Sequence, residues 1–243
     1  MGLNAKNIPM ASGNKGPAQE PIDAGTYPAR VVQVLDLGVQ PQPDFKGQPK
    51  APAHEIMLTY EFLDEFCKDE NGEDDEDKPR WLSETFPLRN LEVELAKSTK
   101  RYYALDPDEA LGGDFTLLVN TPCMVTVVQN PGKGKNAGKV FNNISGISAM
   151  RPKEAAKAEE LKNPPKVFVL DEPDLSIFKS LPQWLQEKIQ SNLNFKGSPL
   201  QKALEGAQDD DEEEAVPQVK ADKKKPARAP VEAQEDADGD EPW

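Results

Sequence analysis

Histidine and cysteine are scarce in this sequence, which has one histidine, His54, and two cysteines, Cys67 and Cys123, in 243 residues. Zinc sites need several His or Cys ligands, so His-rich metal centres and most zinc sites are excluded. His54 could still serve as the base of a catalytic triad, but no Gly-x-Ser-x-Gly nucleophile motif accompanies it. We therefore expect a surface position for His54, no cofactor, no metal site and no enzymatic activity.

The sequence also lacks long apolar runs and any sign of secretion. No segment approaches the length that crosses a bilayer, and the first residues, MGLNAKNIPMASGNKGP, have no apolar core of the kind found in signal peptides. Two cysteines far apart in sequence favour a reduced compartment over a disulfide framework. We therefore expect a soluble cytoplasmic protein.

Two further motifs resemble ligand sites but have the wrong spacing. The segment NPGKGKNAGK contains Gly-Lys pairs, yet a phosphate-binding loop needs four residues between its glycines and a Ser or Thr after the lysine. The acidic run ENGEDDED lacks the ligand spacing of a calcium loop. We expect both segments to be solvated loops.

Negative charge is concentrated in two segments. The chain carries a net charge of −14, and residues 64–77 and 208–243 each contribute −8, so the remainder has a net charge of +2. An acidic protein is an unfavourable partner for nucleic acid. Here, however, the acid lies in separable segments, and the rest of the chain is mildly basic.

Five segments between residues 25 and 150 have the pattern of β-strands. In HEIMLTYEFLDEF (54–66), apolar and polar side chains alternate, which predicts a half-buried strand. The other four are TYPARVVQVLDLGVQ (26–40), RWLSETFPL (80–88), DFTLLVNTPCMVTVVQN (114–130) and VFNNISGISAM (140–150). Between them we expect a Pro/Gly loop over 41–53, an acidic loop over 68–78, and a helix over 88–107 that ends at Pro107.

The order of three strands, one helix and two strands is that of the OB-fold, although other small barrels are also consistent with it. We therefore expect a mainly β protein: a five-stranded Greek-key barrel over 25–150 with a helix between strands 3 and 4. A flexible arm (1–24) would precede it. A C-terminal extension (151–207) would follow, and then a disordered acidic tail (208–243).

The extension contains one amphipathic segment, SLPQWLQEKIQSNL (180–193). It predicts a helix that begins near Ser180 and Pro182. The helix would carry an apolar stripe of Leu181, Trp184, Leu185, Ile189 and Leu193. We expect this stripe to pack on the barrel, with a homodimer contact as the alternative.

The chain resembles the single-stranded DNA-binding proteins of phages and bacteria, most closely the phage replication type. The resemblance is carried by GTYPARVVQVLDLG (25–38), by PCMVTVVQN (122–130) with VFNNISGIS (140–148), and by EDADGDEPW (235–243). It implies an OB-fold that coats single-stranded DNA during replication, recombination or repair, in the host cytoplasm if the protein is phage-encoded. The acidic segment 64–77 is not part of that family's pattern.

Binding single strands without sequence preference requires cations for the phosphates and aromatic faces for the bases. The sequence places such residues together in several predicted loops. The candidates are Phe45, Lys46, Lys50, Arg80, Trp81, Lys97, Lys100, Arg101, Tyr102, Tyr103, Lys133, Lys135, Lys139 and Phe141. Trp81 and one of the two tyrosines are equally consistent with core positions.

The acidic tail ends in an aromatic residue, as it does in the bacterial proteins that the chain resembles, although here the residue is tryptophan. We expect a docking peptide for replication or recombination proteins, made of Asp236, Asp238, Asp240, Glu241, Pro242 and Trp243. The same polyanion would compete with DNA for the basic surface.

Two other functions fit the sequence. The first is a non-catalytic replication or recombination adaptor whose barrel binds protein rather than DNA. The second is a nuclease with carboxylate-bound metal, which the sequence disfavours because most of its acids lie in a loop and a tail rather than on strands.

Overall fold

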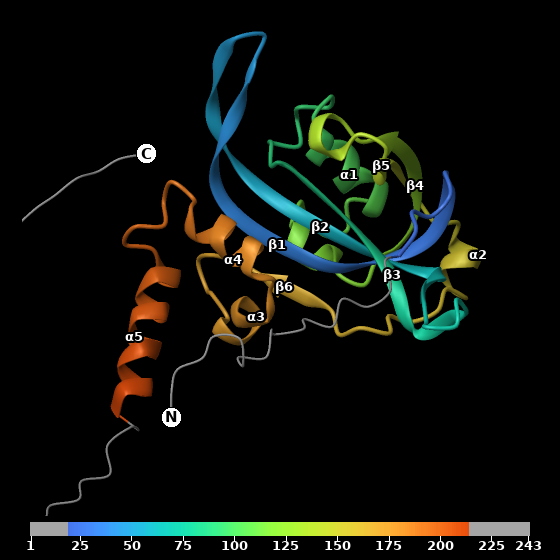
Figure 1. Ribbon diagram of the computed structural model, residues 1–243. Coiled ribbons are helices and arrows are strands. Elements are labelled where there is room, and N and C mark those ends of the chain that lie inside the picture. Colours follow the sequence, from blue (N-terminus) through green and yellow to red (C-terminus); the bar gives the residue numbers. More distant parts are fainter. Residues whose placement is uncertain (1–18, 214–243) are drawn as a thin grey trace, which may run out of the picture.

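The computed structural model describes residues 19–213 (Figure 1). The expected order of three strands, one helix and two strands is confirmed. The elements are β1 (Gly25–Phe45), β2 (Gln48–Lys68), β3 (Asp74–Pro87), α1 (Lys97–Leu105), η2 (Phe115–Leu118), β4 (Pro122–Pro131), η3 (Gly134–Asn136), β5 (Val140–Ala149), α2 (Pro152–Ala155), β6 (Lys166–Phe168), α3 (Leu175–Ser180), α4 (Gln183–Gln190) and α5 (Pro199–Glu213).

The strands form one six-stranded sheet in the order β3-β2-β1-β4-β5, with β6 added to β1. Neighbours along this path are antiparallel, whereas β6 runs parallel to β1 over Gln33–Leu35. In the described part of the chain no hydrogen-bonded ladder joins β3 to β5, so the sheet is not closed. The prediction of a mainly β protein is confirmed.

The inner face of the sheet holds the first core. The alternating residues of β2 that we expected on one face, Ile56, Leu58, Tyr60 and Phe62, are all buried there. Because successive side chains of a strand point to opposite faces, this register places every second residue of β2 inside. Tyr102 of α1 joins the same cluster and closes one end of the core.

The prediction that β2 is only half buried is wrong, because its outer face is covered as well. Met57 is 5% exposed, and Thr59 and Glu61 are each 1% exposed. Leu35, Leu37 and Met57 form a second apolar cluster with residues of β6, α3, α4 and α5. Figure 1 shows this C-terminal extension lying against the middle of β1 and β2.

The amphipathic segment of the extension packs on the sheet, as we expected. Leu181, Leu185 and Ile189 are buried in the second cluster, whereas Trp184 and Leu193 are 59% and 56% exposed. The helix start at Ser180 is wrong. The segment is split, because Ser180 is the last residue of α3 and α4 begins at Gln183, with Pro182 as its N-cap.

Two buried polar side chains fix the connection that leads from β5 to β6. Arg30 donates to the carbonyl oxygens of Glu159 (2.7 Å), Ala158 (3.1 Å) and Asn120 (2.8 Å). Glu61 accepts from the backbone N–H of Lys162 at 2.7 Å. These bonds satisfy groups that would otherwise be buried without partners, which costs roughly 1–3 kcal/mol each.

The expected Pro/Gly loop over 41–53 is instead a continuation of β1 and β2. The two strands extend beyond the body and meet at a two-residue turn, Lys46-Gly47, where φ is 53° and 77° (Figure 1). Turns with positive φ at both positions match the twist of paired strands, and glycine adopts such a φ without strain. The prolines of this segment led us to predict a loop where the structure has a long hairpin.

Three further boundaries differ from the prediction. The acidic loop shortens to residues 69–73, because β2 ends at Lys68 and β3 starts at Asp74. The helix predicted over 88–107 begins only at Lys97. The boundary at residue 208 lies inside α5.

Among residues 19–213, no helix is long and apolar enough to span a membrane.

Candidate nucleic-acid interface

The end of the β1–β2 hairpin presents an aromatic ring beside two cations. Phe45 is 57% exposed, and the Nζ atoms of Lys46 and Lys50 lie 5.3 Å and 4.8 Å from its ring centroid. Ammonium groups at this distance are attracted to the ring, which orders both lysines beside it. One exposed aromatic ring and two cations thus lie together at the end of this hairpin.

The β4–β5 hairpin ends in a similar combination. Phe141 is 43% exposed, and Lys133, Lys135 and Lys139 are exposed in the turn that includes η3. Gly132 begins this turn, and a Cβ there would lie 2.2 Å from the backbone oxygen of Asn136 and 2.8 Å from the Phe141 ring. The glycine therefore allows the turn to fold back against that ring.

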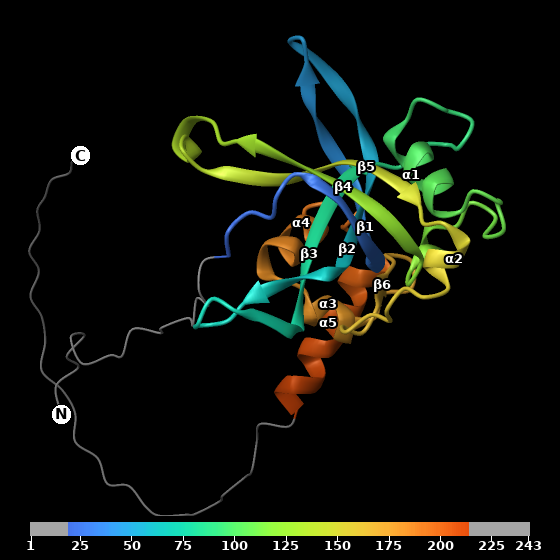
Figure 2. The same ribbon diagram turned by 90° about the vertical axis from the view of Figure 1, so that its right-hand side faces the viewer.

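Figure 2 shows how the hairpins are placed. The β1–β2 hairpin (blue) and the β4–β5 hairpin (yellow-green) leave the body in different directions, and α1 lies on the other side of the β1–β2 hairpin. The basic and aromatic residues therefore do not form one compact patch. They lie on elements to both sides of the β1–β2 hairpin.

Three of the candidates on α1 are exposed. Lys97 forms an ion pair with Glu84 at 2.8 Å and lies 5.5 Å from the Phe86 ring centroid. Lys100 is exposed, and Tyr103 is 37% exposed with its ring in edge contact with that of Tyr102. This helix therefore offers two cations and one partly exposed ring.

Arg101 and Tyr102 are both buried, so the placement of Arg101 at the surface is wrong, whereas for Tyr102 the core alternative is the one observed. Arg101 Nε donates to Glu84 Oε1 at 2.7 Å. Tyr102 donates to Asp106 at 2.9 Å and accepts from the N–H of Gly113 at 2.6 Å. Residues three and four apart share a helix face, so the inward-facing Ser98 carries Arg101 and Tyr102 inward with it. The basic-aromatic composition of KSTKRYY hid this periodicity.

Arg80 and Trp81 lie away from the hairpin ends. Trp81 is 38% exposed, and its Nε1 donates to Glu61 Oε2 at 3.1 Å. It pairs with Glu61 on β2, and a strand rises about 3.3 Å per residue, so it lies roughly 40 Å along β2 from the hairpin turn. Arg80 borders a hollow whose acidic residues are Glu20, Asp23, Glu65, Asp69 and Glu70. This pair is not brought together with the hairpin lysines.

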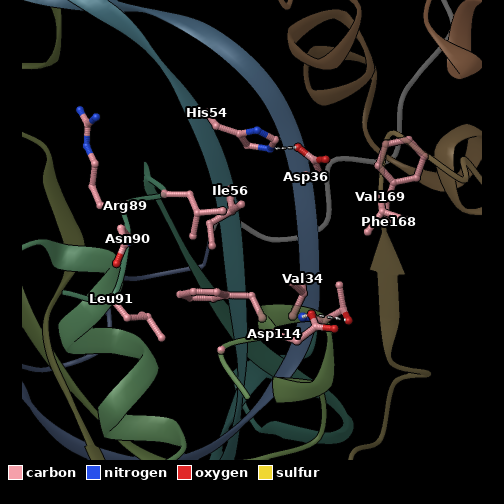
Figure 3. Close-up of a pocket in the computed structure, with 14 residues that line it drawn as sticks. Val34, Asp36, His54, Ile56, Arg89, Asn90, Leu91, Asp114, Phe168 and Val169 are labelled. Carbon is pink, nitrogen blue, oxygen red and sulfur yellow. Dashed lines mark hydrogen bonds and ion pairs between the residues drawn. The ribbon is translucent and has the colours of Figure 1, made fainter. Parts of the chain in front are cut away.

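A pocket of about 660 Å³ lies beside the start of the β1–β2 hairpin (Figure 3). Val34 and Ile56 come from the two strands, Leu91 from the segment before α1, and Phe168 from β6. Its polar residues are Asp36, His54, Arg89, Asn90, Asp114 and Thr116. The sequence did not reveal this pocket, because its lining residues come from segments that are far apart in the chain.

His54 and Asp36 form an ion pair at one side of this pocket, with 2.6 Å between Nε2 and Oδ1. The hydrogen bond to Asp36 raises the pKa of His54, although its partial burial acts in the opposite direction. Burial alone would raise the pKa of Asp36, but hydrogen bonds from His54 and from the backbone of Gly38 lower it below its ordinary value. The pair is therefore most stable with both groups charged.

The predicted docking residues Asp236, Asp238, Asp240, Glu241, Pro242 and Trp243 lie outside the described residues. Within residues 19–213, no group of three or more His, Cys, Asp and Glu side chains is arranged to hold a metal ion.

No protein-family model matches the chain, and no curated protein is significantly similar to it.

Proposed function

We propose that the protein binds single-stranded DNA through the β1–β2 and β4–β5 hairpins, as a non-catalytic protein of DNA replication, recombination or repair. The observation that carries this proposal is that each hairpin ends in an exposed phenylalanine accompanied by lysines, Phe45 on one and Phe141 on the other. Phenylalanine faces stack with bases, and lysines neutralise phosphates regardless of sequence.

The strand connections support an OB-type barrel that stays open between β3 and β5. β1 pairs with β2 and with β4, and β4 pairs with β5, as in a five-stranded Greek key with a helix after the third strand. In OB-folds, oligonucleotides bind to the loops that connect strands 1 and 2 and strands 4 and 5. The two hairpins are those connections.

The C-terminal extension changes how such a barrel can be used. OB-folds also bind oligonucleotides on the face of strands 2 and 3, but here the extension covers the outer face of β1 and β2. The exposed surface that is left on this side is on β3, including Trp81. We infer that the hairpins, rather than the sheet face, provide most of the contact with the DNA strand.

The tail completes the proposal. Residues 208–243 carry a net charge of −8, which opposes that of the hairpin lysines. A tethered polyanion competes with DNA at high effective concentration. When DNA displaces it, its Trp243 end is free to bind replication or recombination partners, with the ring contributing area and the carboxylates steering the approach.

Substitution of the two rings tests the proposal. Phe45→Ala and Phe141→Ala should each weaken binding to an oligo-dT strand by roughly 1–3 kcal/mol, the usual contribution of a stacked ring. Both rings are exposed, so the melting temperature should stay near that of the wild type. Trp184→Ala is the matched control, since it removes an exposed ring from α4. Unchanged affinity in the double variant would refute the proposal.

An adaptor whose barrel binds protein is the second candidate. Its support is Leu95, which is 85% exposed, together with Val93 and Leu117, which are 50% and 54% exposed. Exposed apolar groups of this kind occur at protein interfaces. A chain that lacks residues 208–243 and shows no affinity for oligonucleotides would favour this function.

A further inference from the structure

The pocket beside the β1–β2 hairpin has an apolar interior with a polar rim. Its walls are Val34, Ile56, Leu91, Phe115 and Phe168, and its volume of about 660 Å³ falls within the range of ligand sites, roughly 300–1,000 Å³. Figure 3 shows Arg89, Asn90 and Leu91 on one side and Phe168 and Val169 on the other, with Val34 and Ile56 between them. These walls can contact the apolar faces of a ligand.

Two charged residues on the rim, Asp36 and Arg89, differ in whether they have a partner among the described residues. The Asp36 carboxylate is paired with His54 at 2.6 Å. The guanidinium of Arg89, by contrast, has no hydrogen-bond or ion-pair partner among residues 19–213. An unpaired guanidinium at the mouth of a pocket is a binding group for phosphate, which it can contact through two N–H groups.

Two further polar groups retain unused capacity. Asp114 Oδ1 accepts from the N–H and the hydroxyl of Thr116, at 2.8 Å and 2.7 Å, while its Oδ2 has no partner within the described chain. Asn90 Oδ1 accepts from the N–H of Glu92 at 2.9 Å, and its Nδ2 is unpaired in the same region. The rim thus offers one strong acceptor and one donor.

The pocket adjoins the candidate DNA surface. The N–H of Leu88 donates to the His54 carbonyl at 2.7 Å, which ties the segment before α1 to the start of the hairpin. The N–H of Arg89 donates to Ser98 Oγ at 3.1 Å, in the first turn of the helix that carries Lys97 and Lys100. A bound DNA strand that runs along the β1–β2 hairpin toward α1 would pass the mouth of the pocket.

We propose that the pocket takes one unstacked base of the bound strand, and that this base carries an exocyclic amino group. The apolar walls contact the two ring faces, and Arg89 binds an adjoining phosphate. Asp114 Oδ2 accepts from the amino group, as carboxylates do with cytosine. Cytosine, adenine and guanine carry such an amino group, whereas thymine does not.

The inference rests on the proposed function, and the test separates the two. Titrations of the full chain with (dC)12 and (dT)12 should show about tenfold tighter binding of (dC)12, the effect of one well-placed polar pair with a base. Asp114→Asn should abolish this preference and leave (dT)12 affinity unchanged. Asparagine caps a helix start as well as aspartate does, so η2 should stay folded.

A second variant tests the phosphate contact. Arg89→Ala should reduce the affinity for both strands several-fold more than Arg151→Ala, which removes an exposed arginine from the start of α2. Equal affinity of the wild type for the two strands, or an Asp114→Asn variant that keeps the preference, would overturn the pocket assignment alone. If neither strand binds, the proposed function fails with it.

Discussion

Arg101 and Glu84 form a buried ion pair that joins α1 to β3. Nε and Nη2 of Arg101 donate to the two carboxylate oxygens of Glu84, at 2.7 Å and 3.1 Å. The Tyr60 hydroxyl donates to the same carboxylate at 3.0 Å, and Lys97 pairs with it at 2.8 Å. Glu84 thus holds three partners at one end of the first core.

Removing this carboxylate should destabilise the protein strongly. Glu84→Ala leaves the Arg101 guanidinium buried without a counter-charge, which costs about 3–5 kcal/mol of the free energy of unfolding. Urea denaturation measures the loss, with the exposed Glu92→Ala as the control. A loss below about 1 kcal/mol would mean that water reaches Arg101 and that the pair is not buried.

The His54–Asp36 pair should make stability depend on pH. Folding raises the pKa of His54. The stabilisation is therefore complete below the ordinary histidine value of about 6.5, and it is lost as pH rises through the raised pKa. The pKa of Asp36 is lowered, so its contribution is lost only in acid, below about pH 4. Between these limits the pair contributes fully.

NMR titration of the imidazole provides the measurement, and because His54 is the sole histidine the signal is unambiguous. We expect a pKa above the ordinary value of about 6.5 and a free energy of unfolding that falls as pH rises above that value. His54→Asn should flatten this fall. A titration midpoint at or below the ordinary value would contradict the ion pair.

The two cysteines should differ sharply in reactivity. Burial raises the pKa of the Cys123 thiol to about 12, whereas Cys67 is partly exposed. Since the thiolate is the reactive form, a thiol reagent at pH 8 should modify one cysteine in the native protein and the second only after unfolding. Cys67→Ser should remove the native reaction. Rapid modification of Cys123 would show that the first core opens readily.

The residue pattern predicted the element order and the inner face of β2, because strand alternation is a local property that a sequence displays directly. It failed where tertiary contacts decide. The extension buries the outer face of β2, so Thr59 and Glu61 look exposed in sequence but are covered.

For the candidate site too, local features could be predicted and tertiary contacts could not. Phe45 and its lysines were predictable, because they are neighbours in one hairpin. Arg101 was wrongly predicted at the surface. It is buried because it pairs with Glu84, which lies 17 residues away in the sequence, and its neighbours in the sequence do not indicate this pairing. The pocket at Arg89 and Asp114 could not be predicted, because no local sequence pattern shows which distant segments meet.

Removal of the acidic tail should separate its two proposed roles. Deletion of residues 208–243 takes away a net charge of −8, so the shortened protein should bind DNA more tightly, most clearly at low salt. It retains Leu200 and Leu204, the α5 residues that pack in the second cluster. The deletion should also abolish recruitment of replication or recombination proteins.

The point variant Trp243→Ala changes no charge, so it should leave DNA affinity intact and weaken only partner binding. DNA affinity that does not respond to the deletion at low salt would show that the tail does not compete for the hairpins. Normal partner binding by Trp243→Ala would refute the docking role of the indole.

Binding of single-stranded DNA by the two hairpins can be measured by a fluorescence titration of the full chain with oligo-dT and with a duplex of equal length, each at 50 mM and 200 mM salt. We predict tight binding of the single strand that weakens steeply with salt, because the hairpin lysines release counterions from phosphates. Duplex binding should be much weaker, since paired bases offer no free faces to Phe45 and Phe141. Equal affinity for the two DNA forms, or affinity that does not change with salt, would show that the hairpins are not a site for single-stranded DNA.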